Sequence, residues 1–309
     1  MELVILDAQT LGDDINLDIF KKYDNLTVYQ TTKNEETPDR IKDADIVLTN
    51  KVIINKEVMK KAKKLKLICI TATGTDNVDL EYAKQTGIEV KNVAGYSTYS
   101  VMQTTVHLVL KFMQNLDYYN RYTKEGKWHD CDIFTNLDSP FSQIKGKNWG
   151  IIGLGEIGKA VANIAEWFGA NVAYYSTSGK NHNTKYEQKS LERVLKQSDI
   201  ITIHCGLNDK TYNLINKTNL NMLKDNAILV NVGRGGIINE KDLVEAFEKS
   251  NIQVALDVIE KEPIDSLSHI NKILQSDRFI LTPHIAWSSK EARELLVEKL
   301  LTNIDEFVL

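Results

Sequence analysis

Cysteine is scarce and widely spaced in this chain of 309 residues. The three cysteines, Cys69, Cys131 and Cys205, are an odd number and form no CxxC pair. This spacing indicates neither a structural zinc site nor a disulfide framework, so we assign no metal to the chain. Cys69 and Cys205 lie in or beside apolar segments, which favours buried, hydrophobic positions for both.

Long apolar runs and strong charge of one sign are also missing. No apolar run approaches the roughly 18 residues that a membrane span needs. The first residues, MELVILD, lack the basic and long apolar regions of a secretory signal, so we expect a cytoplasmic protein without membrane association. The formal net charge of −4 argues against a nucleic-acid partner, because such partners are held mainly through their phosphates.

Short apolar runs alternate with amphipathic stretches along the whole chain. The runs that we interpret as strands are residues 3–6, 45–49, 65–70, 88–93, 149–153, 171–175, 199–205, 226–232, 252–258 and 279–284. Alternation of this kind predicts parallel sheets covered by helices on both faces. Apolar spacing of three and four residues predicts one helix over residues 97–121 and another over residues 289–308. Residues 123–147, here called the arm, show neither pattern.

The strand pattern predicts an α/β protein with two doubly wound parallel-sheet domains. The later strands suffice for a complete Rossmann dinucleotide-binding domain, which we place at residues 98–284. Residues 1–97 and 285–309 are expected to form the other, discontinuous domain, with the C-terminal helix packed back on it.

A glycine-rich segment follows the strand at residues 149–153. It reads GLGEIG over residues 153–158, and a helical pattern comes directly after it. In this setting Gly153 would make the tight turn, Gly155 would let a pyrophosphate approach, and Gly158 would let helix and strand pack closely. The helix N-terminus would then bind the phosphates. A glycine turn without a ligand is the alternative that the motif alone leaves open.

Three chemically active residues follow three later strands. Arg234 lies in VGRGG, Glu262 precedes a proline, and His284 lies in TPHIA. Ligands of open parallel sheets bind beyond the carboxyl ends of the strands, so these residues can meet there. An arginine can clamp a carboxylate with two hydrogen bonds; a histidine can exchange a proton near neutral pH, and a nearby carboxylate favours its charged form. Taken singly, each could also be a surface or capping residue.

Together these segments resemble the D-isomer-specific 2-hydroxyacid dehydrogenases. TATGTDNVDL, residues 71–80, resembles the loop with which that family holds the substrate carboxylate. VAGYSTYSV, residues 93–101, and GKWHD in the arm resemble the glycerate dehydrogenase, or hydroxypyruvate reductase, branch. The resemblance implies hydride transfer between a nicotinamide dinucleotide and a small D-2-hydroxy or 2-oxo acid of the hydroxypyruvate, glyoxylate or pyruvate type. It also implies a homodimer built around the arm.

The same resemblance implies a role for each residue. His284 would be the acid/base, Glu262 its partner, and Arg234 the substrate clamp, while the backbone of Thr73 and Gly74 would hold the substrate carboxylate. The expected cofactor contacts are Gly153, Gly155, Glu156, Ile157, Gly158, Ser176, Thr177, Lys180, His204, Val232, Gly233, Asp257 and Ala286. Asp257 would bind the nicotinamide carboxamide, with help from the Val232 carbonyl. The other histidines, His107, His129, His182 and His269, are expected to be structural or surface residues.

The segment YYSTSGKN, residues 174–181, departs from the family pattern. Ser176 lies 23 residues after Gly153, where the family usually has an acid that binds the ribose 2′-hydroxyl and repels a 2′-phosphate. Ser176 and Thr177 are neutral, and Lys180 supplies a cation. We therefore expect either NAD or NADP to be accepted.

Two alternatives within the same fold stay open at this point. Dinucleotide-sensing corepressors of this family keep the arginine, glutamate and histidine, so these residues do not separate them from enzymes. The second alternative is a formate- or phosphite-type dehydrogenase. Formate enzymes of the fold have glutamine where this chain has Glu262, and the Thr73/Gly74 loop contains no lysine, which disfavours both activities.

Overall fold

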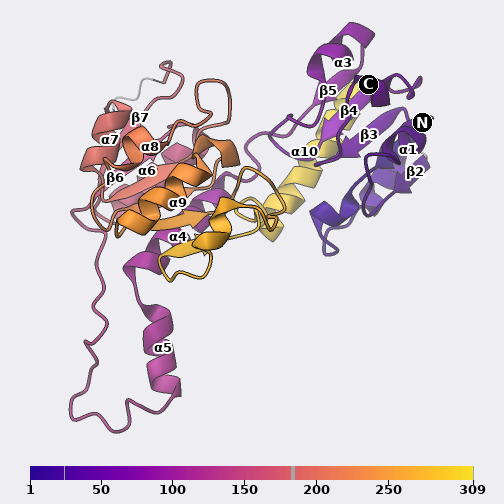
Figure 1. Cartoon of the computed structure of the whole chain (residues 1–309). Helices are drawn as coiled ribbons and strands as arrows, with labels where there is room; N and C mark the ends of the chain where they lie inside the picture. Colours follow the sequence, from indigo (N-terminus) through magenta and orange to yellow (C-terminus); the bar gives the residue numbers. More distant parts are fainter. Residues whose placement is uncertain (24, 182–184, 309) are drawn as a thin grey trace. The chain divides into compact units, whose positions relative to one another are not determined.

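The computed structural model describes residues 1–23, 25–181 and 185–308, and its contacts divide the chain into two compact units (Figure 1). The first unit is Met1–Ser97 with Ser288–Leu309, and the second is Thr98–Trp287. The boundary predicted after His284 therefore comes three residues early. The backbone N–H groups of Ile285 and Ala286 donate to Asp257, which keeps this segment with the second unit.

The first unit is built on a five-stranded parallel sheet. The strand order is β2-β1-β3-β4-β5. The strands are β1 (Glu2–Ile5), β2 (Asn25–Val28), β3 (Ile46–Thr49), β4 (Leu67–Ile70) and β5 (Glu89–Lys91). All residues of β3 and β4 are buried, as expected for central parallel strands covered on both faces. The sequence pattern did not reveal β2, because this edge strand has no buried residue.

Helices of the first unit begin and end at recognisable signals. They are α1 (Thr37–Ile41), α2 (Lys56–Met59), α3 (Leu80–Thr86) and α10 (Lys290–Val308), with the 3-10 turns η1 (Ala8–Leu11) and η2 (Asp18–Tyr23). Asn55 caps α2, Asp79 caps α3, and Gly87 ends α3 in the left-handed conformation. Helix α10 buries Leu296, Leu300 and Ile304, a spacing of four residues that defines one apolar face.

The second unit contains a seven-stranded parallel sheet in the order β12-β11-β10-β9-β6-β7-β8. The strands are β6 (Asn148–Ile152), β7 (Asn171–Tyr175), β8 (Glu187–Gln188), β9 (Ile200–Ile203), β10 (Ile228–Asn231), β11 (Gln253–Leu256) and β12 (Phe279–Leu281). The predicted strands are all present, and only the two-residue β8 was missed. The two parallel sheets with their helices confirm the predicted α/β fold class.

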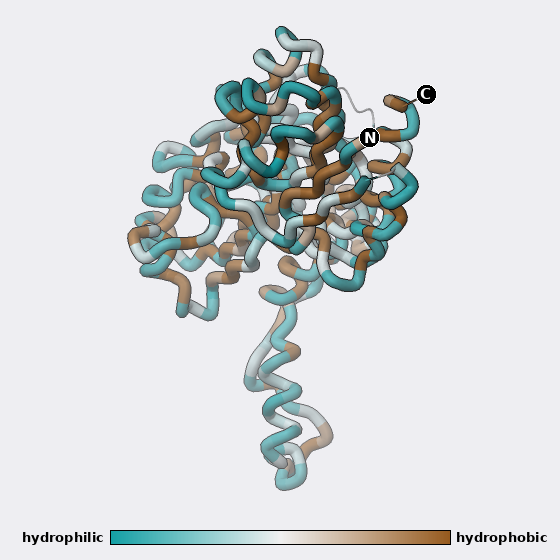
Figure 2. The backbone as a smooth tube through the Cα atoms, turned by 90° about the vertical axis from the view of Figure 1, so that its right-hand side faces the viewer, coloured by the Kyte–Doolittle hydropathy of each residue, from teal (hydrophilic) through white to brown (hydrophobic). Residues whose placement is uncertain are grey.

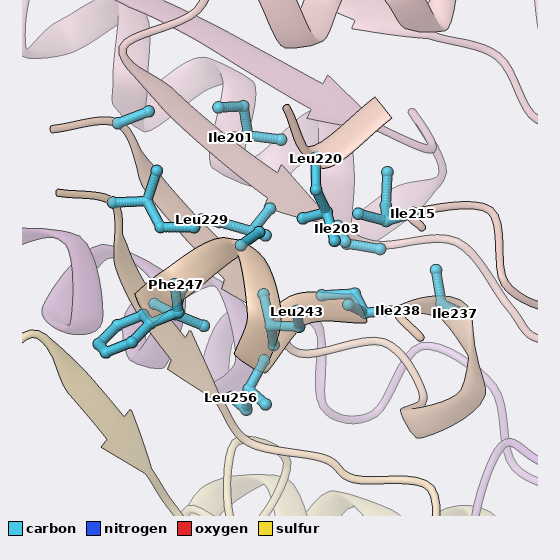
Figure 3. Close-up of a cluster of buried hydrophobic side chains, with 14 of the residues drawn as sticks. Ile201, Ile203, Ile215, Leu220, Leu229, Ile237, Ile238, Leu243, Phe247 and Leu256 are labelled. Carbon is cyan, nitrogen blue, oxygen red and sulfur yellow. The ribbon is translucent and has the colours of Figure 1, made fainter. Parts of the chain in front are cut away.

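Two hydrophobic cores lie on opposite faces of this sheet. One is packed by α4 (Thr98–Met113) and α6 (Glu156–Trp167). The other is packed by α7 (Leu191–Gln197), α8 (Lys217–Leu220) and α9 (Glu240–Lys249), with η3 (Gly235–Ile237) and η4 (His269–Lys272) nearby. Figure 3 shows Leu243 and Phe247 of α9 gathered with side chains of β10 and β11. Both faces are thus covered, which leaves the strand ends for binding.

The prediction of a single helix over residues 97–121 is wrong in one respect. Helix α4 ends at Met113, and α5 (Leu116–Lys124) starts separately. Asn115 interrupts the helix: its backbone ψ is 45°, and its side-chain amide donates to Ser139 and Pro140. This amide ties the outgoing α5 to the returning end of the arm.

The arm extends away from the sheet of the second unit, together with α5 (Figures 1 and 2). Helix α5 has no buried residue. Large apolar side chains are exposed along this segment: Leu116, Trp128, Ile133, Phe134, Leu137 and Phe141. As predicted, the arm beyond α5 contains no strand and no long helix among its residues 125–147.

No helix among the described residues combines the length and the apolar character that a membrane span requires.

Removing the Leu243 side chain should destabilise the second unit. Leu243 is fully buried between α9 and the sheet, and Leu-to-Ala changes at such sites cost about 2–5 kcal/mol. We expect Leu243→Ala to lower the free energy of unfolding in urea by that amount. Leu267→Ala is the matched control, because Leu267 is 87% exposed. Equal stability of the two variants would contradict this packing.

Candidate active site

The glycine-rich segment forms a tight turn between β6 and α6. Gly153 has φ 92°, and a Cβ added there would come within 2.8 Å of Cys205. A Cβ on Gly158 would come within 2.2 Å of the Gly153 carbonyl oxygen. Gly155 differs from both, because a Cβ there would meet nothing within 4 Å. Packing thus requires glycine at positions 153 and 158, whereas Gly155 faces open space where a ligand can approach.

Helix α6 begins directly in this loop. Gly155 is its N-cap and offers no side chain to the first backbone N–H groups. Glu156 and Ile157 form the first turn, where Glu156 is exposed. An uncapped helix N-terminus has unpaired N–H donors and a positive dipole end, so it suits an anion such as a pyrophosphate.

The loop lies at the topological switch point of the sheet. From β6 the chain goes to β7 on one side, and it later returns to β9 on the other side. The Gly153 N–H donates to the Tyr175 carbonyl, and the His204 N–H donates to the Ile152 carbonyl. The residues that follow β7 and β9, Ser176 and His204, therefore flank the glycine loop, at the place where open α/β sheets bind their ligands.

Both flanking residues contain buried polar atoms. Within the described residues, the Ser176 hydroxyl and both ring nitrogens of His204 are buried without a hydrogen-bond partner. Burial lowers the pKa of His204 to about 3, so its ring is neutral at physiological pH. An unsatisfied buried polar group costs about 1–3 kcal/mol, and such groups are typical of sites that a ligand or water completes. These residues fit a dinucleotide.

The residues after Ser176 fold against the glycine loop. The Asn181 side-chain amide donates to the Leu154 carbonyl, and the Tyr174 hydroxyl donates to the Asn181 carbonyl at 3.1 Å. Thr177 is half-buried and Lys180 is exposed. Asn181 was not predicted as a site residue, because nothing in the sequence pattern marks a contact that depends on how this segment folds back.

Arg234 follows β10 in a loop shaped by Asn231. The buried Asn231 side chain accepts from the Gly233 N–H at 3.0 Å and donates to the Arg234 carbonyl at 2.8 Å. Arg234 itself donates to the Gly233 carbonyl at 2.8 Å, and Val232 is buried. Sequence reasoning missed Asn231. Its position between an apolar strand and a glycine turn was the only available signal.

His284 and Glu262 form a direct pair. His284 Nδ1 and Glu262 Oε2 are 2.7 Å apart, and the two side chains are 23% and 31% exposed. The other carboxylate oxygen of Glu262 accepts from the Ile259 N–H at 3.2 Å. His284 has φ 55°, a left-handed conformation that is uncommon for residues other than glycine and asparagine. The histidine is therefore held by its backbone and by its carboxylate partner.

Asp257 organises the segment that contains His284. Its carboxylate accepts from Thr282 Oγ1 at 2.6 Å, the Ile285 N–H at 2.8 Å and the Ala286 N–H at 2.9 Å. The His284 N–H donates to the Asp257 carbonyl at 2.9 Å. Burial raises the pKa of the Asp257 carboxyl, and the hydrogen bonds to the carboxylate oppose that shift.

The structure brings the predicted catalytic residues to one edge. Strands β10, β11 and β12 are parallel neighbours in the sheet, and Arg234, Glu262 and His284 lie beyond their carboxyl ends. Thr73 and Gly74 belong to the first unit. There, Thr73 Oγ1 donates to the Val93 carbonyl at 2.9 Å.

Three of the remaining histidines belong to the described residues. His107, His129 and His269 are exposed, and His182 lies outside the described residues. Across residues 1–23, 25–181 and 185–308, no group of three His, Cys, Asp or Glu side chains could hold a metal ion.

Replacing Asp257 by asparagine should loosen the segment after β12. An amide nitrogen in place of one carboxylate oxygen would face an N–H donor, and an unpaired buried donor costs about 1–3 kcal/mol. We expect Asp257→Asn to lower the free energy of unfolding by that amount in urea denaturation. Asp277→Asn is the control, because Asp277 is exposed in the same unit. Unchanged stability of Asp257→Asn would show that these hydrogen bonds contribute little.

Comparison with known proteins agrees with this geometry. Residues 106–286 match the model of the D-isomer specific 2-hydroxyacid dehydrogenase NAD binding domain. The chain is 37% identical to a hydroxypyruvate reductase of Blautia hydrogenotrophica, over 100% of this chain and 97% of the relative. It is 34% identical to a glycerate dehydrogenase of Methylorubrum extorquens, over 99% of this chain and 96% of the relative.

A solved structure extends the likeness to the fold of the whole chain. An acyclic imino acid reductase in complex with NADPH and D-Arg has a TM-score of 0.86 and 26% identity, and the match covers 100% of this chain and 97% of that one. The full-length relatives and the matched domain together establish the family. The chain belongs to the D-isomer-specific 2-hydroxyacid dehydrogenases, and it is an oxidoreductase with an NAD(P)-binding domain.

Proposed function

We propose that this enzyme reduces a small 2-oxo acid of the hydroxypyruvate or glyoxylate type to the D-2-hydroxy acid. The observation that supports this most directly is the 2.7 Å pair between His284 Nδ1 and Glu262 Oε2, beside the strand end that holds Arg234. The full-length relatives named hydroxypyruvate reductase and glycerate dehydrogenase support the substrate class.

His284 serves as the proton donor in the proposed reduction. With Nδ1 directed at the Glu262 carboxylate, the hydrogen-bond network assigns a proton to Nδ1 and makes Nε2 the atom that exchanges with substrate. The carboxylate stabilises the charged imidazolium through a charge-assisted hydrogen bond. The ring can then donate its Nε2 proton to the oxygen that becomes negative at C2, and in the reverse direction it accepts that proton.

Arg234 binds and polarises the 2-oxo acid. Its planar guanidinium can hold a carboxylate or carbonyl oxygen in a fixed geometry, and Asn231 holds the loop that presents it. Thr73 and Gly74 remain the predicted backbone contacts for the substrate carboxylate. A bound nicotinamide supplies the hydride chemistry, while these side chains orient the substrate and offset the developing charge.

The cofactor is proposed to be either NADH or NADPH. Ser176 replaces the acid that would repel a 2′-phosphate, and its buried hydroxyl lies beside the glycine loop. The imino acid reductase of similar fold was solved with NADPH, which supports the proposal. Asp257 stays the predicted contact for the nicotinamide carboxamide, beside its role in folding residues 282–286.

The arm supports a homodimer. Its apolar side chains, among them Phe134 at 90% exposed and Leu137 at 74% exposed, lie on a segment without a core of its own. A contiguous set of exposed apolar groups is typical of a protein–protein interface. Sedimentation equilibrium of the whole chain would test the proposal, and a monomer at micromolar concentration would exclude it.

His284→Asn should slow reduction of hydroxypyruvate by a factor on the order of 100 or more, because a general acid typically contributes about 10²–10⁴. Asparagine tolerates the left-handed backbone at this position better than alanine does. The measurement is kcat from NADH absorbance at 340 nm, with glyoxylate and pyruvate as further substrates. His107→Asn is the control, because His107 is exposed in the same unit.

Near-normal turnover in folded His284→Asn would remove His284 from the mechanism. If the wild-type protein bound NADH but turned over no member of the panel, the dinucleotide-sensing alternative would be favoured instead.

Ser176→Asp should shift the cofactor preference toward NADH. A carboxylate there would accept from the ribose 2′-hydroxyl and repel a 2′-phosphate. A charge-assisted hydrogen bond is worth roughly 1.5–3 kcal/mol, so the NADH/NADPH ratio of kcat/KM should rise about 10- to 100-fold. Ser178→Asp adds the same charge at an exposed position and should change the ratio less. A wild type that already refuses NADPH would show that Ser176 does not face the ribose.

A further inference from the structure

The loop that holds Arg234 and the loop that holds Glu262 touch through their backbones. A Cβ added to Gly235 would lie 2.0 Å from the Ile259 carbonyl oxygen and 2.5 Å from the Glu260 nitrogen. No other residue fits at this position without moving one of the loops. The Arg234 loop and the Glu262 loop therefore pack directly against each other at the carboxyl ends of β10 and β11.

Glu240 adds a contact between helix α9 and the loop that holds Glu262. It lies in the first turn of α9, six residues after Arg234, and its Oε1 accepts from the Glu260 N–H at 2.6 Å. The start of α9 is held by Asn239, whose N–H donates to the Ile215 carbonyl at 2.8 Å and whose side chain caps the Asp242 N–H at 3.0 Å. The carboxylate of Glu240 thus extends from a well-anchored helix end to an irregular loop.

The surroundings of Glu240 act on its charge in both directions and, on balance, raise its pKa. The side chain is half-buried, and burial raises the pKa of Glu240, while the hydrogen bond from Glu260 opposes that rise. The negative charge of Glu260 also raises it and His269 lowers it. A hydrogen bond to an ionised carboxylate is about twice as strong as a neutral one.

We propose that Glu240 is a positioning residue, which holds the backbone at Glu260 so that Glu262 meets His284 in the right place. The inference rests on the proposed function, because His284 must exchange a proton for the placement to matter. Only Lys261 lies between Glu260 and Glu262, so a shift of the Glu260 peptide moves the carboxylate that contacts His284 Nδ1. Misplacement of a catalytic group by about 1 Å can cost a factor on the order of 100 in rate.

Tyr212 gives the same loop a further contact. Its hydroxyl donates to Glu260 Oε1 at 3.2 Å, and its ring would lie 3.2 Å from a Cβ on Gly236. Tyr212 thus bridges the Arg234 loop and the side chain of Glu260, whereas Glu240 holds the Glu260 backbone. The Glu240 contact to the Glu260 backbone affects the position of Glu262 more directly than the Tyr212 contact to the Glu260 side chain does.

The test compares Glu240→Ala, Glu240→Gln and Glu248→Ala in the whole chain. Glu240→Ala removes the acceptor, Glu240→Gln keeps an acceptor oxygen without the charge, and Glu248→Ala removes an exposed acid from the same helix. We expect kcat for hydroxypyruvate to fall about 10- to 100-fold in Glu240→Ala, with KM for NADH unchanged. Glu240→Gln should recover most of the loss, and Glu248→Ala should match the wild type.

Hydrogen exchange supplies a readout that needs no turnover. Mass spectrometry of the peptide spanning residues 257–263 should show faster exchange in Glu240→Ala, and wild-type exchange in Glu240→Gln and Glu248→Ala. A wild type without activity would refute the proposed function, while faster exchange in Glu240→Ala would still support the loop contact.

Two results would overturn the inference. One is unchanged exchange at residues 257–263 in Glu240→Ala. The other is an equal loss of melting temperature in Glu240→Ala and Glu240→Gln, with normal kcat in both. That pattern is expected of an acid that only stabilises the first turn of a helix.

Discussion

The buried carboxylate of Asp257 holds together the loops at the carboxyl ends of β10, β11 and β12. It lies at the end of β11 and binds the segment after β12 through Thr282, Ile285 and Ala286. Its own N–H donates to the Asn231 carbonyl at the end of β10 at 2.9 Å. One residue therefore links three strand ends. The Asp257 carbonyl also accepts the N–H of His284, whose backbone is left-handed.

The two hydrophobic cores make this edge rigid without contributing to its chemistry. Helices on both faces bury nearly every residue of the central strands, and the polar side chains of the site lie at the strand ends and in the loops beyond them. There each buried polar group must find a partner or a ligand. Asn231 and Asp257 satisfy the loops internally. Ser176 and His204, beside the glycine loop, contain buried polar atoms that have no partner among the described residues, as does Thr71 in the first unit. Asn231 and Asp257 thus shape the site, whereas Ser176 and His204 offer polar atoms to a ligand.

Much of the fold could be predicted because its signals are local. Parallel strands covered on both faces appear as short apolar runs, and a glycine turn between strand and helix has a recognisable spacing. Arg234, Glu262 and His284 could be proposed together for the same reason, since each lies at the end of such a run or within a few residues after it. The features that were not predicted have only weak local signals in the sequence. β2 is an edge strand without buried residues, β8 has two residues, and the break at Asn115 depends on contacts with Ser139 and Pro140.

The sequence by itself determined the α/β class, the positions of most strands along the chain, the glycine loop and the identity of the three residues at the strand ends. Only the tertiary structure decided which groups hold those residues. Glu240 contacts Glu260 across 20 residues, and Asp257 contacts Ala286 across 29. Such contacts follow from the order of strands in the sheet and from the packing of α9 against it. A single hydrogen bond between distant loops leaves no periodic pattern in the sequence, whereas burial of a whole strand does.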